Sequence, residues 1–169
     1  IGLAQEHLPL IPKPQSIERT NGSFSLTAKT TILATNTSVE AKYLKEALQL
    51  QTGLALSINS KHTDNTVQLV LKLPDSTVFN AEHYELYCSK DKISITAFSN
   101  QGIFYGIQTL LQLIPFEEKN EIKVPCLTIN DHPKFQWRGM HLDVSRHFFP
   151  TDFIKKYIDY LALYKMNTF

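Results

Sequence analysis

The residues best suited to chemistry lie in one segment, FQWRGMHLDVSRHFFP, at positions 135–150. This segment begins as an aromatic, apolar strand pattern. A charged turn follows at residues 143–147, called the corner below, and two Phe and a Pro then lead into a helix pattern. A strand, a corner and a helix make one βα unit, and in βα folds the corner after the strand is where binding and catalytic residues gather. We therefore take this corner as the candidate site.

Three residues of the corner carry polar chemistry: Asp143, Arg146 and His147. We expect an Asp–Arg ion pair that shapes the loop, with His147 as a further loop residue. His141 and Asp143 lie two apart on one strand face and could mimic a metal pair, but no third ligand is visible. We therefore predict no metal site and no cofactor.

The strand pattern at residues 135–144 directs alternate side chains to opposite faces, and both faces are largely apolar, as in a barrel strand buried on two sides. Arg138 and Asp143 then fall on opposite faces. A regular strand cannot direct both side chains to one place, whereas a β-bulge near Gly139 would remove the conflict.

The composition excludes several classes of partner. With 17 basic and 16 acidic residues the formal net charge is +1, so no broad field attracts nucleic acid or an anionic membrane. The hydrophobic content of 43% and the charged content of 20% are globular values, and no apolar run approaches the roughly 18 residues of a membrane helix. The sequence also lacks a phosphate-binding glycine loop and a nucleophile elbow.

Two further features concern the compartment of the protein. Cys88 and Cys126 have no metal or redox spacing, so we expect buried small apolar side chains in preference to a disulfide, while the sequence leaves their pairing open. Residues 1–5, IGLAQ, are typical either of the tail of a secretory signal or of a frayed terminus. We expect a secreted or periplasmic protein.

The elements before the candidate site predict one α+β domain over residues 8–131, followed by a second unit over residues 132–169. The expected helices are 38–53, 100–115 and 151–165, and the expected strands are 23–26 and 30–35 as an edge hairpin after a turn at Asn21–Gly22, then 54–58, 67–73, 84–89, 92–98 and 124–129. This order predicts a mostly antiparallel sheet with two helices on one face. Gly102 and Gly106 should allow close approach of the second helix to the sheet.

The candidate segment resembles a known family. Trp137-Arg138-Gly139 and the run from Leu142 to Pro150 resemble the first barrel strand and loop of the family 20 glycoside hydrolases, the β-N-acetylhexosaminidases. Residues 84–113, with GIFYGIQTLLQL, resemble the N-terminal α+β domain of that family, and Pro12-Lys13-Pro14 resembles its start. The resemblance covers nearly the whole chain, and it implies that residues 132–169 begin an incomplete (β/α)8 barrel.

The resemblance also implies a function. It implies that Arg138 binds hydroxyls of a terminal N-acetylglucosamine or N-acetylgalactosamine of a glycan, and the planar fork of an Arg suits vicinal hydroxyls. Without the resemblance, a buried Arg paired with a carboxylate would be preferred. The implied mechanism retains configuration, because the 2-acetamido oxygen of the substrate attacks the anomeric carbon.

The implied catalytic carboxylates are absent from the 169 residues. The family uses an adjacent Asp-Glu pair, and no Asp-Glu dipeptide occurs in the sequence. The nearest similar pair, Glu117–Glu118, should be solvated. We therefore expect the N-terminal portion of a β-N-acetylhexosaminidase, inactive by itself, with no catalytic residue in this chain.

The alternative is a non-catalytic carbohydrate-binding or protein-interaction module. It would need aromatic side chains exposed on one surface, and the candidates are Tyr84, Tyr87, Phe104 and Tyr105. One barrel strand and one helix cannot close a barrel, so residues 135–169 should expose an apolar face. We expect this face to dock on the first domain or to cause self-association.

Overall fold

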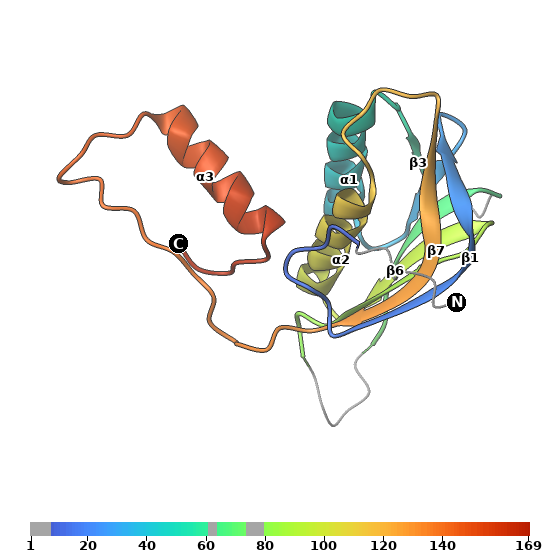
Figure 1. The fold of residues 1–169 in the computed structure, drawn as a ribbon, viewed down its shortest axis with the longest axis horizontal. Helices are drawn as coiled ribbons and strands as arrows, with labels where there is room; N and C mark the ends of the chain where they lie inside the picture. Colours follow the sequence, from blue (N-terminus) through green and yellow to red (C-terminus); the bar gives the residue numbers. More distant parts are fainter. Residues whose placement is uncertain (1–7, 61–63, 74–79) are drawn as a thin grey trace, which may run out of the picture. The chain divides into compact units, whose positions relative to one another are not determined.

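The structure is a computed structural model that describes residues 8–60, 64–73 and 80–169 (Figure 1). Residues 1–5, on which the expectation of secretion rests, lie outside this part. The chain divides into two compact units, and the boundary between them in the sequence lies between His132 and Pro133. No helix among the described residues has the length and apolar character needed to cross a membrane.

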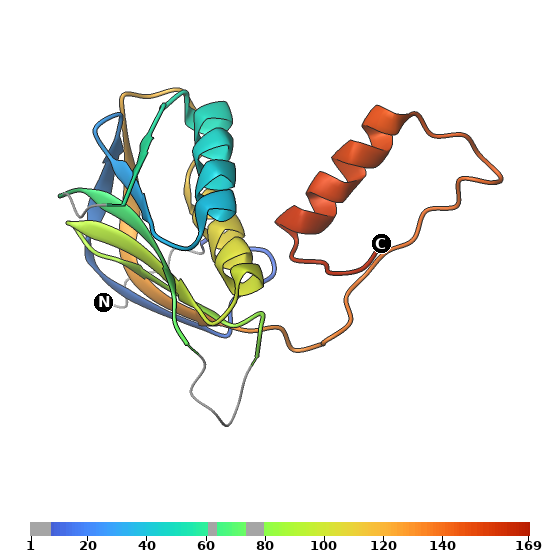
Figure 2. The ribbon, with the colours of Figure 1, turned by 180° about the vertical axis from the view of Figure 1, so that it is seen from behind.

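The larger unit is built on one sheet, in which the described residues form seven strands (Figures 1 and 2). They are β1 Ser16–Thr27, β2 Thr31–Ala34, β3 Ser57–Asn59, β4 Thr66–Leu71, β5 Tyr84–Cys88, β6 Lys92–Ala97 and β7 Glu121–Asp131, in the order β1-β7-β5-β6-β4-β2-β3. The pairs β1–β7, β7–β5 and β5–β6 are antiparallel, whereas β6–β4, β4–β2 and β2–β3 are parallel. The sheet is therefore mixed, and the prediction of a mostly antiparallel sheet is wrong. A helical crossover follows β2, and crossovers of this kind join parallel strands.

The first strand differs most from the prediction. The expected hairpin does not form, because β1 runs through Asn21–Gly22 and pairs with β7, far across the sheet from β2. The pairing register shifts between Arg19 and Ser23, and Gly22 has a φ of 111°, which favours glycine. Ser23 lies opposite Pro125, which has no N–H for a regular ladder. The Asn-Gly pair thus marks an irregularity within one long strand.

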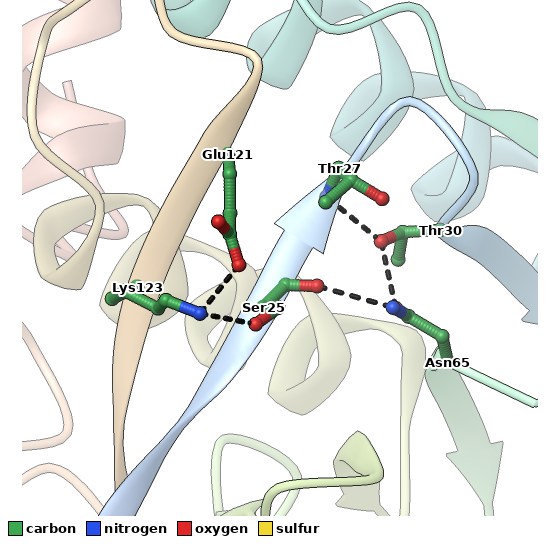
Figure 3. Close-up of polar contacts among 6 residues, drawn as sticks. All are labelled: Ser25, Thr27, Thr30, Asn65, Glu121 and Lys123. Atoms are coloured by element: carbon green, nitrogen blue, oxygen red, sulfur yellow. Dashed lines mark hydrogen bonds and ion pairs between the residues drawn. The ribbon is translucent and has the colours of Figure 1, made fainter.

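Polar side chains fix the true turn, which joins β1 to β2 (Figure 3). The Thr30 hydroxyl accepts a hydrogen bond from the Thr27 amide at 3.0 Å and donates one to Asn65 Oδ1 at 2.7 Å. Asn65 Nδ2 in turn donates to the Ser25 carbonyl at 3.2 Å. Asn65 has a φ of 56°, a conformation that Asn tolerates better than most residues. The turn is therefore held to the start of β4.

Two helices cover one face of this sheet, as predicted (Figures 1 and 2). Helix α1, Ser38–Thr52, ends at Gly53 in the left-handed conformation, and helix α2, Asn100–Leu113, begins after Ser99, whose hydroxyl accepts from the Gly102 amide at 3.1 Å. The helices contact each other and the sheet. The core between them includes the fully buried side chains Phe24, Leu44, Leu86, Ile95, Ile103 and Ile107.

The glycines of α2 allow the predicted close approach to the sheet. A Cβ atom at Gly102 would lie 2.4 Å from the His83 carbonyl oxygen and 2.8 Å from Ala97 Cβ. A Cβ atom at Gly106 would lie 2.4 Å from Ile95 Cγ2. All three distances are too short for a side chain, so the expectation from sequence is confirmed.

We predict that Gly102→Ala destabilises the larger unit. Overpacking costs about 1–3 kcal/mol, and the upper part of this range, about 2–3 kcal/mol, applies here because the nearest atom is a backbone oxygen. The better helix propensity of Ala returns about 1 kcal/mol, so the free energy of unfolding should fall by about 1–2 kcal/mol. Urea unfolding measures this change. Asn100→Ala, at the exposed start of the same helix, is the control and should change stability by less than about 0.5 kcal/mol. Equal stability of the Gly102→Ala variant would contradict the close packing.

Both cysteines are free and buried, as expected. Burial, and secondarily the neighbouring Cys126, raise the pKa of the Cys88 thiol from 9.0 to about 12. Because the folded state favours the neutral thiol, its contribution to stability is complete below pH 9.0 and is lost as the pH rises toward about 12.

We predict that an aromatic disulfide reagent leaves Cys88 unmodified in the native chain near neutral pH and modifies it after denaturation. Rapid modification of the native chain would contradict this.

The smaller unit contains the predicted helix, α3, Thr151–Leu163. The expected strand at residues 135–144 does not form, and within residues 133–169 the pairing is a single parallel bridge between Gly139 and Thr168. A barrel strand forms backbone hydrogen bonds with a neighbouring strand on each side, whereas here only residues 166–169 run beside residues 135–144. The close approach requires glycine, because a Cβ atom at Gly139 would lie 2.8 Å from the Thr168 carbonyl oxygen. The proposed bulge near Gly139 is replaced by this bridge.

Candidate functional site

The guanidinium of Arg138 is held by backbone carbonyl groups. Its Nε donates to the Lys165 carbonyl at 2.9 Å, and its Nη1 donates to the Phe135 carbonyl at 2.7 Å. Arg138 is half-buried. These contacts come from both sides of the βα unit, because Phe135 precedes Arg138 and Lys165 follows α3.

The end of α3 brings the Lys165 carbonyl to this position. Lys165 has a φ of 57°, and the Met166 amide donates to the Leu161 carbonyl at 2.8 Å, so the helix closes with a left-handed cap. The Lys165 residue is buried, with 6% of its surface exposed. A left-handed Lys costs about 1 kcal/mol relative to Gly, so the turn is maintained by the contacts around it.

The backbone of Arg138 is held by residue Asn167. The Arg138 amide donates to Asn167 Oδ1 at 2.9 Å, and the Asn167 amide donates to the Arg138 carbonyl at 2.8 Å. Asn167 Nδ2 also donates to the Gln136 carbonyl at 2.7 Å. Our reasoning from sequence did not identify Asn167. Its only signal was its place beside Thr168, between the apolar residues Met166 and Phe169, in a short strand pattern.

The charged corner forms a compact loop around Asp143. Asp143 Oδ1 accepts from the amides of Ser145 at 2.9 Å and Arg146 at 3.2 Å, and its Oδ2 pairs with the Arg146 guanidinium. The amide and guanidinium of Arg146, followed by the Ser145 amide, hold the pKa of Asp143 below its ordinary value. The His147 ring meets the Phe149 ring edge to face, with 4.9 Å between centroids.

This loop and the Arg138 contacts differ in chemistry. Both Asp143 oxygens accept hydrogen bonds within the loop, which is the pattern of an Asx-type turn. Arg138 instead supplies N–H donors, which suit neutral oxygen acceptors such as hydroxyl and carbonyl groups. The part of the chain that the structure describes contains no group of three His, Cys, Asp or Glu residues placed to hold a metal ion.

A cavity of about 380 Å³ lies within the smaller unit, beside α3. Its lining is aromatic and apolar, comprising Met140, Tyr157, Tyr160, Leu161, Tyr164 and Met166. None of these side chains is a carboxylate or an imidazole, so the cavity offers no general acid or base near neutral pH. The lining of the cavity is therefore suited to apolar packing and not to acid–base catalysis.

The aromatic surface required by the alternative module does not form. Tyr84 and Tyr105 are buried, with Tyr84 hydrogen-bonded to Asp131 at 2.8 Å and to Thr109 at 2.6 Å. Phe104 is half-buried and packs on Tyr43, with 5.3 Å between the ring centroids. Of the four candidates only Tyr87 is exposed. Three of the four aromatic side chains therefore belong to the packing of the larger unit.

Comparison with known proteins relates both units to one enzyme family. The family model described as glycosyl hydrolase family 20, domain 2, matches residues 7–132. The model described as glycosyl hydrolase family 20, catalytic domain, matches residues 135–169. A beta-hexosaminidase from Porphyromonas gingivalis is 36% identical, in an alignment that covers 95% of this chain and 22% of the relative.

Solved structures agree with these matches. A mutant beta-hexosaminidase from Streptomyces plicatus, in complex with the product GlcNAc, has a TM-score of 0.84 and 32% identity, covering 95% of this chain and 33% of that one. A family 20 exo-beta-N-acetylglucosaminidase from Vibrio harveyi, in complex with N-acetylglucosamine, has a TM-score of 0.82 and 32% identity, covering 100% and 26%. The chain thus spans between about a fifth and a third of the length of these relatives.

Proposed function

The chain belongs to glycosyl hydrolase family 20, and from this membership we propose that it is the N-terminal portion of a β-N-acetylhexosaminidase. The observation that carries the proposal is the pair of adjacent family matches, which together cover residues 7–132 and 135–169. The named relatives are hexosaminidases, and two of the solved structures hold GlcNAc. The substrates proposed are glycans that end in N-acetylglucosamine or N-acetylgalactosamine.

We propose residues 8–131 as the N-terminal α+β domain and residues 132–169 as the start of a (β/α)8 catalytic barrel. The order within the second part supports this assignment. A segment around Gly139 is followed by α3, and the chain then returns to a parallel bridge at Thr168. This is the connectivity of a βαβ unit at its first point of pairing.

We propose that Arg138 binds the terminal sugar and that the loop residues act through shape. The carbonyl contacts of Arg138 fix the direction of a planar fork of N–H donors, which suits two neighbouring hydroxyl groups. Asp143 and Arg146 neutralise each other within the loop, and His147 packs on Phe149. These three residues would set the wall of the pocket.

The proposed reaction retains the anomeric configuration. The 2-acetamido oxygen of the substrate attacks the anomeric carbon as the glycosidic bond breaks, and a carboxylic acid protonates the leaving oxygen. Water then opens the cyclic intermediate, assisted by the same carboxylate as base. The Asp-Glu pair that would act here does not occur in the 169 residues. This chain would therefore supply substrate contacts and scaffold.

Proton NMR of the full-length protein tests this mechanism. During hydrolysis of an aryl N-acetyl-β-glucosaminide, the first sugar released should be the β-anomer, with the α-anomer appearing later by mutarotation. Initial release of the α-anomer would contradict retention, and no release of sugar would contradict the proposed function.

We also propose that the isolated 169-residue chain self-associates through its smaller unit. Several large apolar side chains there are exposed: Phe135, Trp137, Met140, Val144, Phe148, Phe153, Ile158, Tyr160, Tyr164 and Phe169. Apolar groups of this number favour contact with a second copy over contact with water. Light scattering should show a mass above 19.3 kDa that rises with concentration. A constant monomer mass would contradict self-association.

A secreted or periplasmic location remains our proposal for the whole protein. Its support is the sequence of residues 1–5, which is typical of the end of a secretory signal.

A further inference from the structure

The side chain of Asn167 lies where the backbone of a neighbouring strand would otherwise form hydrogen bonds around Arg138. The backbone pairing between the two segments is short: the Met140 amide donates to the Thr168 carbonyl at 3.3 Å, and the Thr168 amide donates to the Arg138 carbonyl at 3.1 Å. Toward the N-terminus the pairing continues through the side chain of Asn167. This side chain accepts from the Arg138 amide and donates to the Gln136 carbonyl.

The geometry of these two bonds is that of a parallel ladder. In a parallel pair, one residue donates its N–H to the residue before its partner and accepts from the residue after it. The carboxamide of Asn167 makes both bonds, to Gln136 and Arg138, which flank Trp137. It therefore takes the place of the N–H and C=O that one residue of a neighbouring strand would supply. Asn can do this because its side chain carries both a donor and an acceptor.

We propose that Asn167 is a positioning residue for Arg138 in the sugar pocket, an inference that rests on the function proposed above. Besides the Phe135 carbonyl, two anchors from the segment after α3 hold Arg138: Asn167 holds its backbone, and the carbonyl of Lys165 holds its Nε. The two anchors lie two residues apart, just beyond the end of α3. Arg138 therefore meets the substrate from a fixed direction, which lowers the entropy that binding must remove.

The test compares Asn167→Leu with Asn167→Asp in the full-length enzyme, assayed on an aryl N-acetyl-β-glucosaminide. Both variants lose the bond to Gln136, but only Asp keeps the oxygen that accepts from the Arg138 amide. For Asn167→Leu we expect KM to rise about tenfold with a smaller change in kcat, and for Asn167→Asp a rise of less than about threefold. Asn120→Leu, in an exposed loop of the larger unit, is the matched control and should leave both constants unchanged.

A double-mutant cycle separates this inference from the proposed function. If Asn167 acts through Arg138, Asn167→Leu should have little further effect on KM in an Arg138→Ala background. Additive effects, or an unchanged KM for Asn167→Leu while Arg138→Ala raises it, would overturn the positioning role. If Arg138→Ala leaves KM unchanged, the sugar-binding role proposed for Arg138 fails and the inference fails with it. If the wild-type enzyme releases no sugar, the proposed function itself fails. Should Asn167→Leu not fold, Asn167→Ala gives the same comparison.

Discussion

The purified 169-residue chain is expected to hydrolyse an aryl N-acetyl-β-glucosaminide no faster than buffer does. Glycoside hydrolysis at neutral pH needs a general acid to protonate the leaving oxygen and a group that stabilises the positive charge at the anomeric carbon. No Asp-Glu pair occurs in the sequence, and the corner carboxylate, Asp143, is a depressed-pKa group held within its own loop. A carboxylate of low pKa is a poor proton donor near neutral pH.

Release of the aryl group measures this expectation over hours of incubation. The full-length protein at equal molar concentration is the positive control, and an Asp143→Asn variant of the 169-residue chain separates trace contamination from intrinsic activity. Turnover by the wild-type chain that disappears in Asp143→Asn would show that the corner itself is catalytic. That result would replace our assignment of Asp143 as a loop residue.

Arg138→Ala in the full-length enzyme should lower kcat/KM by about 100-fold, because hydrogen bonds from a charged group to the substrate contribute about 1.5–3 kcal/mol. Arg138→Lys should lower it by about tenfold, since Lys keeps the charge but not the fork of donors. The same variants should affect an N-acetylglucosaminide and an N-acetylgalactosaminide by different factors if Arg138 contacts the hydroxyls at which these sugars differ.

The control for this prediction is Arg19→Ala, which removes an exposed guanidinium from β1 in the other unit and should leave kcat/KM unchanged. Because Arg138 also anchors two carbonyl groups, circular dichroism must show that the variants are folded. Wild-type kcat/KM in a folded Arg138→Ala enzyme would mean that Arg138 is a structural residue, the interpretation favoured by its type alone.

The helices were predictable from sequence because their signals are local. The apolar spacing and the glycine at position 53 mark α1, and the Pro150–Thr151 start marks α3. The strands were less predictable, because Asn21–Gly22 is equally suited to a turn and to an irregular strand. The choice between them depends on β7, about a hundred residues away along the chain.

The site shows the same limit. Arg138 was proposed as a site residue through the motif around it, since a lone Arg in an apolar strand pattern carries no functional signal. Asn167 was missed because its side chain makes the two hydrogen bonds that the backbone of a strand residue would make, and only the paired segments reveal them. The prediction of a strand at residues 135–144 was wrong, because a strand needs a neighbouring segment along its length and here the pairing is limited to one bridge, between Gly139 and Thr168.

The most direct measurement for the whole account is the turnover of two aryl glycosides by the full-length protein. One is the N-acetyl-β-glucosaminide, and the other is the β-glucoside, which has a hydroxyl in place of the 2-acetamido group. Membership of family 20 together with substrate assistance predicts rapid release of the aryl group from the first and none above buffer from the second. Comparable turnover of both, or turnover of the glucoside alone, would contradict the proposed activity.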